Sequence, residues 1–284
     1  MILLDLNQIV VSNLMQQINI SKDDKVEEDF LRHMILNAIR SVRSKFSDQY
    51  GELIICSDSF NYWRKELFPH YKANRKKSRD NSIFDWNAIF KTINKIKNEI
   101  KENFPYHYIE IHTAEADDII ATLTKHYHVS EKILIVSGDK DFVQLQKYPN
   151  VSQYSTISKS WIKESDPKSF LLEKVLTGDG GDGIPNFLSD DDVFVNDSKR
   201  QKRLTKKKID LIMSAKNPQS IMTDLEYRGY VRNKYLIDFD HIPESLEKKV
   251  LEELQKPIEA TSTNVYKYLM RNGLKALLNN IGDF

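Results

Sequence analysis

The chain of 284 residues carries 42 Lys and Arg against 41 Asp and Glu, so its formal net charge is +1. This length can bury a full hydrophobic core, the single cysteine excludes a disulfide within the chain, and no window approaches the roughly 18 apolar residues of a membrane span. The first residues lack a basic segment and Asp5 breaks their apolar run. We therefore expect no signal peptide and a soluble, cytoplasmic protein.

Short apolar runs alternate with amphipathic segments over the first 180 residues. Strands are expected at Ile2–Leu6, Leu53–Cys56, Tyr106–Ile111 and Lys132–Val136, and helices at Val26–Phe46, 86–100 and Glu115–Tyr127. The basic segment 59–82 contains Pro69 and has no clean period, so we expect a loop or poorly packed helices over the surface. The alternation predicts an α/β fold with a central, mostly parallel sheet flanked by helices.

Later residues have a different pattern. A further apolar run at Val151–Ser155 is followed by a helical segment, Pro167–Leu176, and by the Gly-rich stretch Gly178–Gly183. Beyond Thr205 the periodicity predicts mainly helices, around Ile209–Ala215, Pro218–Arg228, Pro243–Leu254 and Val265–Leu278. We expect an α/β core at 1–180, which includes segment 59–82, and a smaller helical region at 181–284.

Acidic residues follow each of the four expected strands and recur in the Gly-rich stretch. In chain order they are Asp5, Asp58, Glu115, Asp117, Asp118, Asp139, Asp141, Asp179 and Asp182. Because the carboxyl ends of parallel strands meet at one edge of a sheet, where α/β proteins bind ligands, we expect these side chains to converge. Any single one would usually be only a turn or cap residue, so the interpretation depends on their number and shared location.

Crowded carboxylates need counter-cations. Each close pair of ionised carboxylates costs about 1–4 kcal/mol in repulsion. Oxygen ligands without a nearby set of His or Cys favour Mg²⁺ or Mn²⁺ over zinc. Two such ions about 4 Å apart commonly hydrolyse phosphodiester bonds. The sequence therefore predicts two Mg²⁺ ions, with Mn²⁺ able to substitute.

Two basic segments are candidate nucleic-acid contacts. The first mixes cations with aromatic rings, at Tyr62, Arg64, Tyr71, Lys72, Arg75, Lys76 and Lys77. The second comprises Arg200, Arg203, Lys206, Lys207 and Lys208. Cations with interleaved rings suit an unpaired strand, because phosphates bind the cations and bases stack on the rings, whereas a dense cation run suits duplex phosphates. Both segments could instead be solvated charge runs, and that alternative stays open.

These stretches together resemble the 5′ nuclease superfamily, which includes flap endonucleases, the 5′ nuclease domain of bacterial DNA polymerase I and phage exonucleases. The likeness is greatest to its T-even bacteriophage ribonuclease H branch. It is carried by Leu4-Asp5, Asp58, Tyr62-Trp63-Arg64, Tyr71-Lys72, Glu115-Ala116-Asp117-Asp118, Asp139-Lys140-Asp141 and Gly178-Asp179 with Asp182-Gly183-Ile184-Pro185. It continues through Leu236–Asp240 and the last twenty residues, so it covers nearly the whole chain.

The resemblance implies a PIN-like 5′ nuclease core with specific residue roles. A first metal would be held by Asp5, Asp58, Glu115, Asp117 and Asp139, and a second, often through water, by Asp118, Asp141, Asp179 and Asp182. Lys72 and Arg75 would lie at the base of a helical arch formed by segment 59–82, with Lys72 steadying the scissile phosphate. Tyr71 would stack on the terminal base, and Asp118 and Asp139 would be essential for catalysis.

One stretch departs from the family pattern. Asp182-Gly183-Ile184-Pro185-Asn186 leads into Asp190-Asp191-Asp192 and not into the glycine hairpin with which relatives bind duplex DNA, often with a K⁺ ion. We therefore expect no K⁺ site and a larger role in duplex binding for the basic residues at 200–208.

The predicted function is a divalent-metal-dependent 5′-3′ exonuclease and flap endonuclease with RNase H activity, removing RNA primers during phage DNA replication. Expected substrates are branched or 5′-ended duplex DNA and RNA-DNA hybrid. We expect a monomer without membrane contact, in the host cytoplasm, with a phage single-stranded-DNA-binding protein as a candidate partner. Two alternatives remain: a non-catalytic branched-DNA-binding protein on the same fold, and another acid-cluster hydrolase such as a phosphatase or PIN-type ribonuclease.

Overall fold

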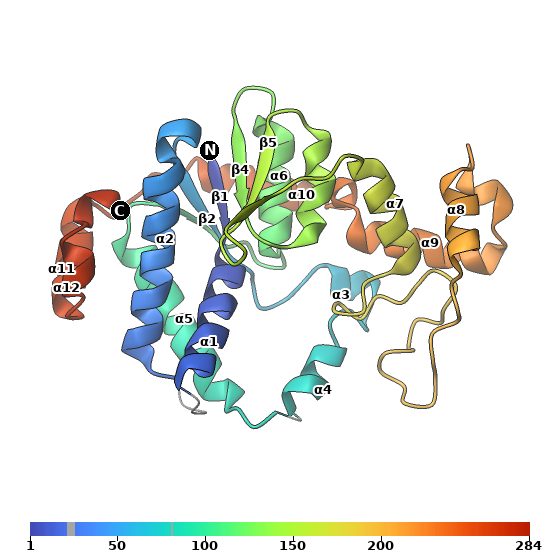
Figure 1. Ribbon diagram of the computed structural model, residues 1–284, viewed down its shortest axis with the longest axis horizontal. Coiled ribbons are helices and arrows are strands. Elements are labelled where there is room, and N and C mark those ends of the chain that lie inside the picture. The colour runs from blue at the N-terminus through green and yellow to red at the C-terminus, as the bar shows by residue number, and fades with distance from the viewer. Residues whose placement is uncertain (22–25, 81) are drawn as a thin grey trace.

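A computed structural model describes residues 1–21, 26–80 and 82–284, without the side chains of residues 21, 77 and 78. A six-stranded sheet with the strand order β3-β2-β1-β4-β5-β6 forms its centre (Figure 1). The strands are β1 (Ile2–Asp5), β2 (Leu53–Cys56), β3 (His107–Ile109), β4 (Ile133–Val136), β5 (Val151–Ser155) and β6 (Ser160–Ile162). The first five are parallel and β6 is antiparallel to β5. The expected mostly parallel sheet is confirmed, with an additional edge strand.

Helices cover both faces of the sheet. One face packs against α1 (Leu6–Ser21), α2 (Glu28–Tyr50), α5 (Trp86–Asn103), α11 (Ser262–Arg271) and α12 (Lys275–Leu278). The other packs against α6 (Ala116–Tyr127), α10 (Glu244–Leu254) and the 3-10 helix η1 (Lys140–Lys147). Successive residues of β1 alternate between the two cores, since Ile2 and Leu4 belong to the first and Leu3 to the second. Burial on both faces explains why β2 and β4 are apolar throughout and β1 is apolar up to Asp5.

Segment 59–82, which we expect to be a loop or poorly packed helices over the surface, is partly buried. It contains two short helices, α3 (Arg64–Leu67) and α4 (Asn74–Asp80). Part of its first half is buried: Phe68 and Tyr71 are each only 3% exposed and pack with Val175 and Ile184 in a small separate core, whereas Phe60 and Leu67 are 79% and 57% exposed. Only its second half, around α4, extends away from the sheet, in the lower part of Figure 1.

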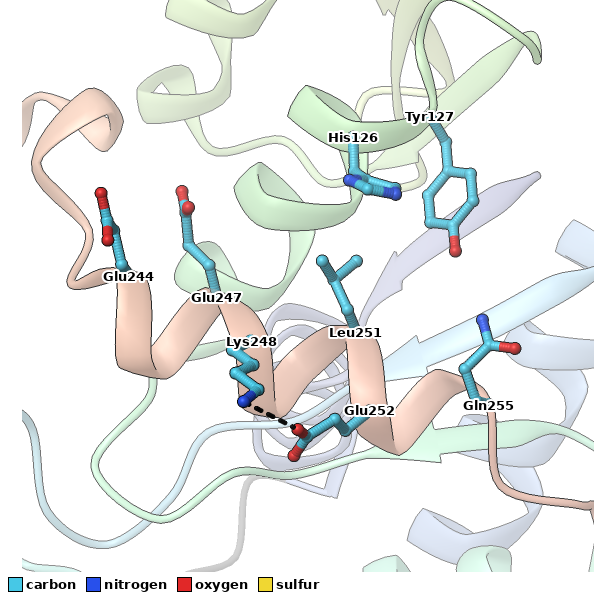
Figure 2. A pocket seen from close by; sticks show the side chains of 8 residues that line it. All are labelled: His126, Tyr127, Glu244, Glu247, Lys248, Leu251, Glu252 and Gln255. Atoms are coloured by element: carbon cyan, nitrogen blue, oxygen red, sulfur yellow. Dashed lines mark ion pairs between the residues drawn. The ribbon is translucent and has the colours of Figure 1, made fainter.

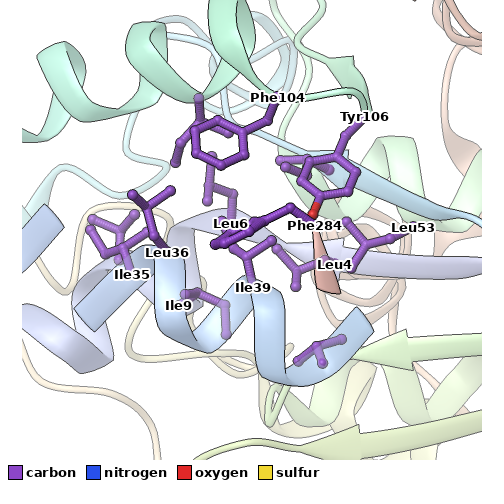
Figure 3. Packing of buried hydrophobic residues seen from close by; sticks show 14 of the residues in the cluster. Leu4, Leu6, Ile9, Ile35, Leu36, Ile39, Leu53, Phe104, Tyr106 and Phe284 are labelled. Atoms are coloured by element: carbon purple, nitrogen blue, oxygen red, sulfur yellow. The ribbon is translucent and has the colours of Figure 1, made fainter. Parts of the chain in front are cut away.

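The helices from residue 167 onward lie in three places. Helices α7 (Pro167–Thr177), α8 (Lys206–Met213) and α9 (Asp224–Ile237), with the short turns η2 (Pro218–Ile221) and η3 (Phe239–His241), extend to one side of the sheet (Figure 1). Helix α10 instead packs on α6, and α11, α12 and η4 (Ile281–Asp283) return to the α2 and α5 side. Figure 3 shows Phe284 beside Phe104 and Leu4 in that core. In the described part of the chain, no helix is both long and apolar enough to cross a bilayer.

Candidate active site

The predicted acids lie at the ends of strands and at the start of a helix. Asp5 is the last residue of β1, whereas Asp58 and Asp139 stand shortly after β2 and β4. Glu115 is the N-cap of α6. An oxygen of Asp58 accepts a hydrogen bond from the backbone nitrogen of Ala116, at 2.7 Å, so the loop after β2 is held against the start of α6. Parallel strand order therefore brings acids from distant parts of the sequence to one edge.

The Gly-rich turn brings the remaining acids to the same place. Asp117, Asp141, Asp179 and Asp182 line one small cavity, together with Arg64 and Tyr71. The turn depends on Gly178, whose φ of +72° is unfavourable for other residues and where a Cβ would lie 2.4 Å from the carbonyl oxygen of Ile184. Asp179 and Asp182 are therefore positioned by backbone geometry that the glycine permits.

Four of the acids have too few positively charged neighbours to offset their burial and mutual repulsion. Burial raises the pKa of Asp5 to about 6, and the nearby carboxylates of Asp58 and Asp139 add to this shift. Burial likewise raises the pKa of Asp58 and of Asp139. The pKa of Asp117 lies well above its ordinary value, first because of desolvation and then because of Asp139, Asp5 and Glu115. Desolvation and mutual repulsion thus disfavour ionisation of this group unless a cation is bound.

The other acids have basic side chains beside them. Glu115 contacts Arg64, at 2.8 Å, and Lys72, and it accepts a hydrogen bond from the Tyr71 hydroxyl, at 2.8 Å. Burial alone would raise the pKa of Glu115, but Lys72 and Arg64 bring it below its ordinary value. Asp182 pairs with Arg75, and the Lys72 ammonium lies 3.7 Å away. Lysine and arginine therefore neutralise one half of the acidic site.

Lys174, which sequence reasoning did not select, lies among the acids. It is in the last turn of α7 and pairs with Asp141 and, at 3.2 Å, with Asp179. Burial would raise the pKa of Asp179, but Lys174 keeps it below its ordinary value. The sequence offers one signal for Lys174, a basic residue shortly before Gly178-Asp179. The same signal is expected for a lysine that only compensates the dipole at a helix C-terminus.

Asp118 and Arg64 have positions that differ from their expected roles. Asp118 is fully buried, and its carboxylate contacts the guanidinium of Arg64, at 2.8 Å, and the indole nitrogen of Trp63, at 3.0 Å. Arg64 is 3% exposed and also donates to the backbone oxygen of Leu236, at 2.8 Å. In this structure Asp118 therefore pairs with a protein cation, and Arg64 is buried with its guanidinium directed at internal partners.

Tyr71 and Lys72 are fixed by the Gly-rich turn. Tyr71 is 3% exposed, so in this conformation its ring is not open to a base. Lys72 adopts a φ of +57°, and its backbone nitrogen donates to the backbone oxygen of Asp182, at 2.7 Å. A left-handed conformation at a lysine is costly and persists only where surrounding contacts enforce it. Those contacts hold the Lys72 ammonium beside Glu115.

Uncharged side chains support the loops that carry the acids. The Ser137 hydroxyl donates to Asp5, at 2.9 Å, and the buried Gln153 amide donates to the backbone oxygens of Ser137 and Asp139. Gln144 joins η1 to the end of α9, since its amide donates to the backbone oxygen of Ile237 and accepts from the backbone nitrogen of Phe239. Nothing in the sequence marks Ser137 or Gln153 as supporting residues, and Gln144 stands out only because it lies shortly after Asp141.

The remaining candidate nucleic-acid contacts differ in accessibility. Tyr62 is half-buried with its ring edge on Tyr71, Arg75 is 47% exposed and Lys76 is exposed. The Lys77 side chain lies outside the described residues. In the second segment the exposed residues are Arg200, Arg203, Lys206 and Lys207. Lys208 is paired with Glu226 and is partly buried.

A groove of about 460 Å³ lies elsewhere, between α6 and α10. His126 and Tyr127 line one side and residues of α10, including Glu247, Lys248 and Leu251, the other (Figure 2). None of the predicted site residues contributes to it. We therefore place the candidate active site at the acids, although the cavity there is smaller than this groove.

The acid side chains fit a hard divalent cation. They supply only oxygen ligands, as Mg²⁺ and Mn²⁺ prefer, and the raised pKa values of Asp5, Asp58, Asp117 and Asp139 indicate unmet negative charge. Within the described residues, however, no three acid, His or Cys side chains already converge at metal-ligand spacing. In this structure Lys72 and Lys174 each contact two of the acids.

Comparison with known proteins identifies the family. The family described as 5′-3′ exonuclease, N-terminal resolvase-like domain, matches residues 2–174, and the C-terminal domain of T4 RNase H matches residues 166–284. The chain belongs to the 5′-3′ exonuclease family. This nuclease is 32% identical to the ribonuclease H of Enterobacteria phage T4, over 99% of its own length and 95% of that protein. It is also 28% identical to the flap endonuclease Xni of Shewanella piezotolerans, over 61% of its length and 67% of that protein.

Solved structures confirm the fold. The nuclease resembles the bacteriophage T5 D15 protein co-crystallised with metal ions, with a TM-score of 0.64 and 18% identity, over 89% of this chain and 99% of the other. A complex of the T5 D15 flap endonuclease with DNA and metal ions gives a TM-score of 0.63 at 20% identity, over 90% and 99%. At this identity the likeness establishes the 5′ nuclease fold alone.

Proposed function

We propose that this nuclease is a divalent-metal-dependent 5′-3′ exonuclease and flap endonuclease with RNase H activity. The observation that carries the proposal is the gathering of acids from several strand ends and the Gly-rich turn around one cavity. The relatives named ribonuclease H and flap endonuclease support the substrate class. On the basis of the same relatives, we propose that its role is the removal of RNA primers during phage DNA replication.

The acids divide into two groups of candidate metal ligands. Asp5, Asp58, Glu115, Asp117 and Asp139 would hold one Mg²⁺, and Asp141, Asp179 and Asp182 a second, with Mn²⁺ able to replace either. When bound, such ions would acidify a water molecule and neutralise charge on the phosphate. Asp118 would act through Arg64, which holds Glu115 in place.

The chain's own cations would position the nucleic acid. Lys72 and Arg75 lie beside Asp182 at the edge of the cavity and could exchange that carboxylate for a phosphate oxygen. Tyr62 and the exposed Lys76 lie next to them, and Lys77 follows in the sequence; rings and cations together suit an unpaired 5′ strand. Arg200, Arg203, Lys206 and Lys207 would bind duplex phosphates, contacts that carry no sequence information.

The expected substrates are branched or 5′-ended duplex DNA and RNA-DNA hybrid. We propose that the protein acts as a monomer in the host cytoplasm, in cooperation with a phage single-stranded-DNA-binding protein. The phage T4 relative supports this setting.

A cleavage assay tests the proposal. 5′-labelled flap, nicked and RNA-DNA hybrid substrates should yield short 5′ products with Mg²⁺ and none with EDTA, whereas a small phosphomonoester should remain intact. Metal-dependent binding without cleavage would establish the non-catalytic DNA-binding alternative. Hydrolysis of the phosphomonoester alone would establish another acid-cluster hydrolase.

A further inference from the structure

The ammonium of Lys174 lies in the part of the site proposed for a second metal ion. The side chain is 17% exposed and joins Asp141, which follows β4, to Asp179 in the Gly-rich turn. It thereby contacts two of the three acids proposed as ligands of that ion. Lys174 is in the last turn of α7, so its flexible stem is anchored to a helix that packs against η1.

The two proposed groups of acids differ in how they are neutralised. Among the described side chains, four of the five acids proposed for the first ion, Asp5, Asp58, Asp117 and Asp139, form no ion pair, whereas the fifth, Glu115, pairs with Arg64 and Lys72. In contrast, Asp141 and Asp179 share Lys174, and Asp182 has Arg75 and Lys72. Most acids of the first group therefore have no ion-pair partner, whereas every acid of the second group has one.

A divalent ion and an ammonium cannot share the same two carboxylates. Like charges about 4 Å apart repel by several kcal/mol at the effective dielectric of a partly buried site, and the ion also needs the oxygens that Lys174 contacts. The lysine must therefore withdraw before an ion can bind there. Its four-carbon stem allows this, because a lysine carries a compact charge on a flexible chain.

We propose that Lys174 is an internal counter-cation that competes with the second divalent ion for Asp141 and Asp179. This inference rests on the function proposed above. A first ion binds among the four unpaired acids without displacing a protein cation from them. The second binds more weakly, because its binding includes the cost of displacing Lys174. The ammonium so released is close to the cavity and is available to a phosphate oxygen of the substrate.

The simplest alternative is a structural lysine that only compensates the dipole at the C-terminus of α7. Lys168 provides a matched control, because it is on the same helix but exposed at the opposite end. The variants are Lys174→Met, which keeps an apolar stem without the charge, Lys174→Arg, which keeps the charge, and Lys168→Met.

Titration of Mn²⁺ followed by electron paramagnetic resonance, without DNA, measures the competition directly. In the unchanged protein we expect one tight and one weaker binding event. In Lys174→Met the weaker event should tighten at least about tenfold, the scale expected for removing a neighbouring like charge, with the tight event unchanged. Lys174→Arg and Lys168→Met should behave as the unchanged protein. Unaltered or weaker Mn²⁺ binding in Lys174→Met would overturn the proposal.

A second measurement needs no variant, in case Lys174→Met does not fold. Acetylation of the unchanged protein with limiting acetic anhydride, read by mass spectrometry, reports how accessible each lysine is. Modification of Lys174 should accelerate as Mg²⁺ fills the weaker site, with Lys168 constant; a constant Lys174 rate would refute the competition. Cleavage of a flap by the unchanged protein, assayed in parallel, separates the two proposals, because its failure refutes the function without altering the metal-binding result.

Discussion

Asp118 and Asp139 show how one residue type can have opposite roles within one site. Asp118 is fully buried against Arg64 and Trp63, whereas the pKa of Asp139 is raised by burial, and nearby Asp179 contributes to the shift. Removing the charge of Asp118 leaves the buried Arg64 guanidinium incompletely paired. Removing the charge of Asp139 relieves repulsion and takes away a proposed metal ligand.

Asp118→Asn should therefore destabilise the fold by about 3 kcal/mol, the usual cost of breaking a buried ion pair. Asp139→Asn should retain or increase the free energy of unfolding but reduce cleavage about a hundredfold or more, as expected for a disrupted metal site. Urea denaturation and a flap-cleavage assay measure the two quantities. Wild-type stability in Asp118→Asn would show that its ion pair contributes nothing.

Stability should depend on pH in the direction set by Asp5. Its pKa in the folded protein is about 6, above the ordinary value of 3.8, so the folded state binds a proton that the unfolded state does not. Stability without metal should rise as the pH falls from 7.5 to 5.5, by about 1 kcal/mol from Asp5 alone. Mg²⁺ should raise the melting temperature more at pH 7.5 than at pH 5.5. Thermal denaturation in EDTA that shows falling stability over this range would contradict the assignment.

At the scale of secondary-structure elements, α9 is held close to the chain segment before it. Gly229 allows this approach, because a Cβ there would lie 2.0 Å from the backbone oxygen of Phe187. Gly229→Ala should therefore destabilise the protein by about 2 kcal/mol, the typical cost of overpacking. Gly282→Ala is the control, since a Cβ there meets nothing within 4 Å. Chemical denaturation of both variants tests the contrast, and equal midpoints would show that the segment relaxes freely.

The basic residues around the start of α8 should bind duplex DNA additively. Replacing Arg200, Arg203, Lys206 and Lys207 by Ala should lower the slope of log affinity against log salt by about 0.9 for each phosphate that is no longer neutralised. Lys208→Ala should leave the slope unchanged, because Glu226 already holds that ammonium. Fluorescence anisotropy at several salt concentrations measures the slope. An unchanged slope in the fourfold variant would show that these residues are merely solvated.

Helices and strands could be predicted from the sequence where the hydrophobic periodicity was regular. The parallel strands and α6 follow from apolar runs and spacing, and the gathering of acids follows from strand direction. Helix α1 was missed because its outward side carries Val11, Met15 and Ile20, which blur the polar face. The pairing of Arg64 with Asp118 could not be predicted, since a basic and aromatic segment reads the same whether its cations neutralise internal acids or external phosphates.

At the scale of the whole molecule, α11 links the C-terminal residues to the N-terminal core. Tyr268 is 2% exposed, packs on Phe104, and donates to Glu99, at 2.8 Å. Glu99 in turn accepts from the buried Arg32, also at 2.8 Å, so α2, α5 and α11 share one polar network.

Tyr268→Ala should therefore destabilise the protein by about 3–5 kcal/mol, as for other buried aromatic residues, although Tyr268 lies outside the acidic site. Cleavage per folded molecule should stay unchanged at a temperature where the variant remains folded. Tyr266→Ala on the same helix is the control, since Tyr266 is 53% exposed. A large loss of activity in a fully folded Tyr268→Ala would show that the core and the acids are coupled.

The return of α11 and α12 to the first core also sets the timing of folding during synthesis. A ribosome releases α2 and α5 long before the residues that cover them, so the apolar surface around Phe104 remains uncovered until Phe284 has emerged. Nascent chains therefore expose an aggregation-prone apolar surface during the later part of translation, a stage at which chaperones act. A chain released early would lack this cover and should aggregate or be degraded.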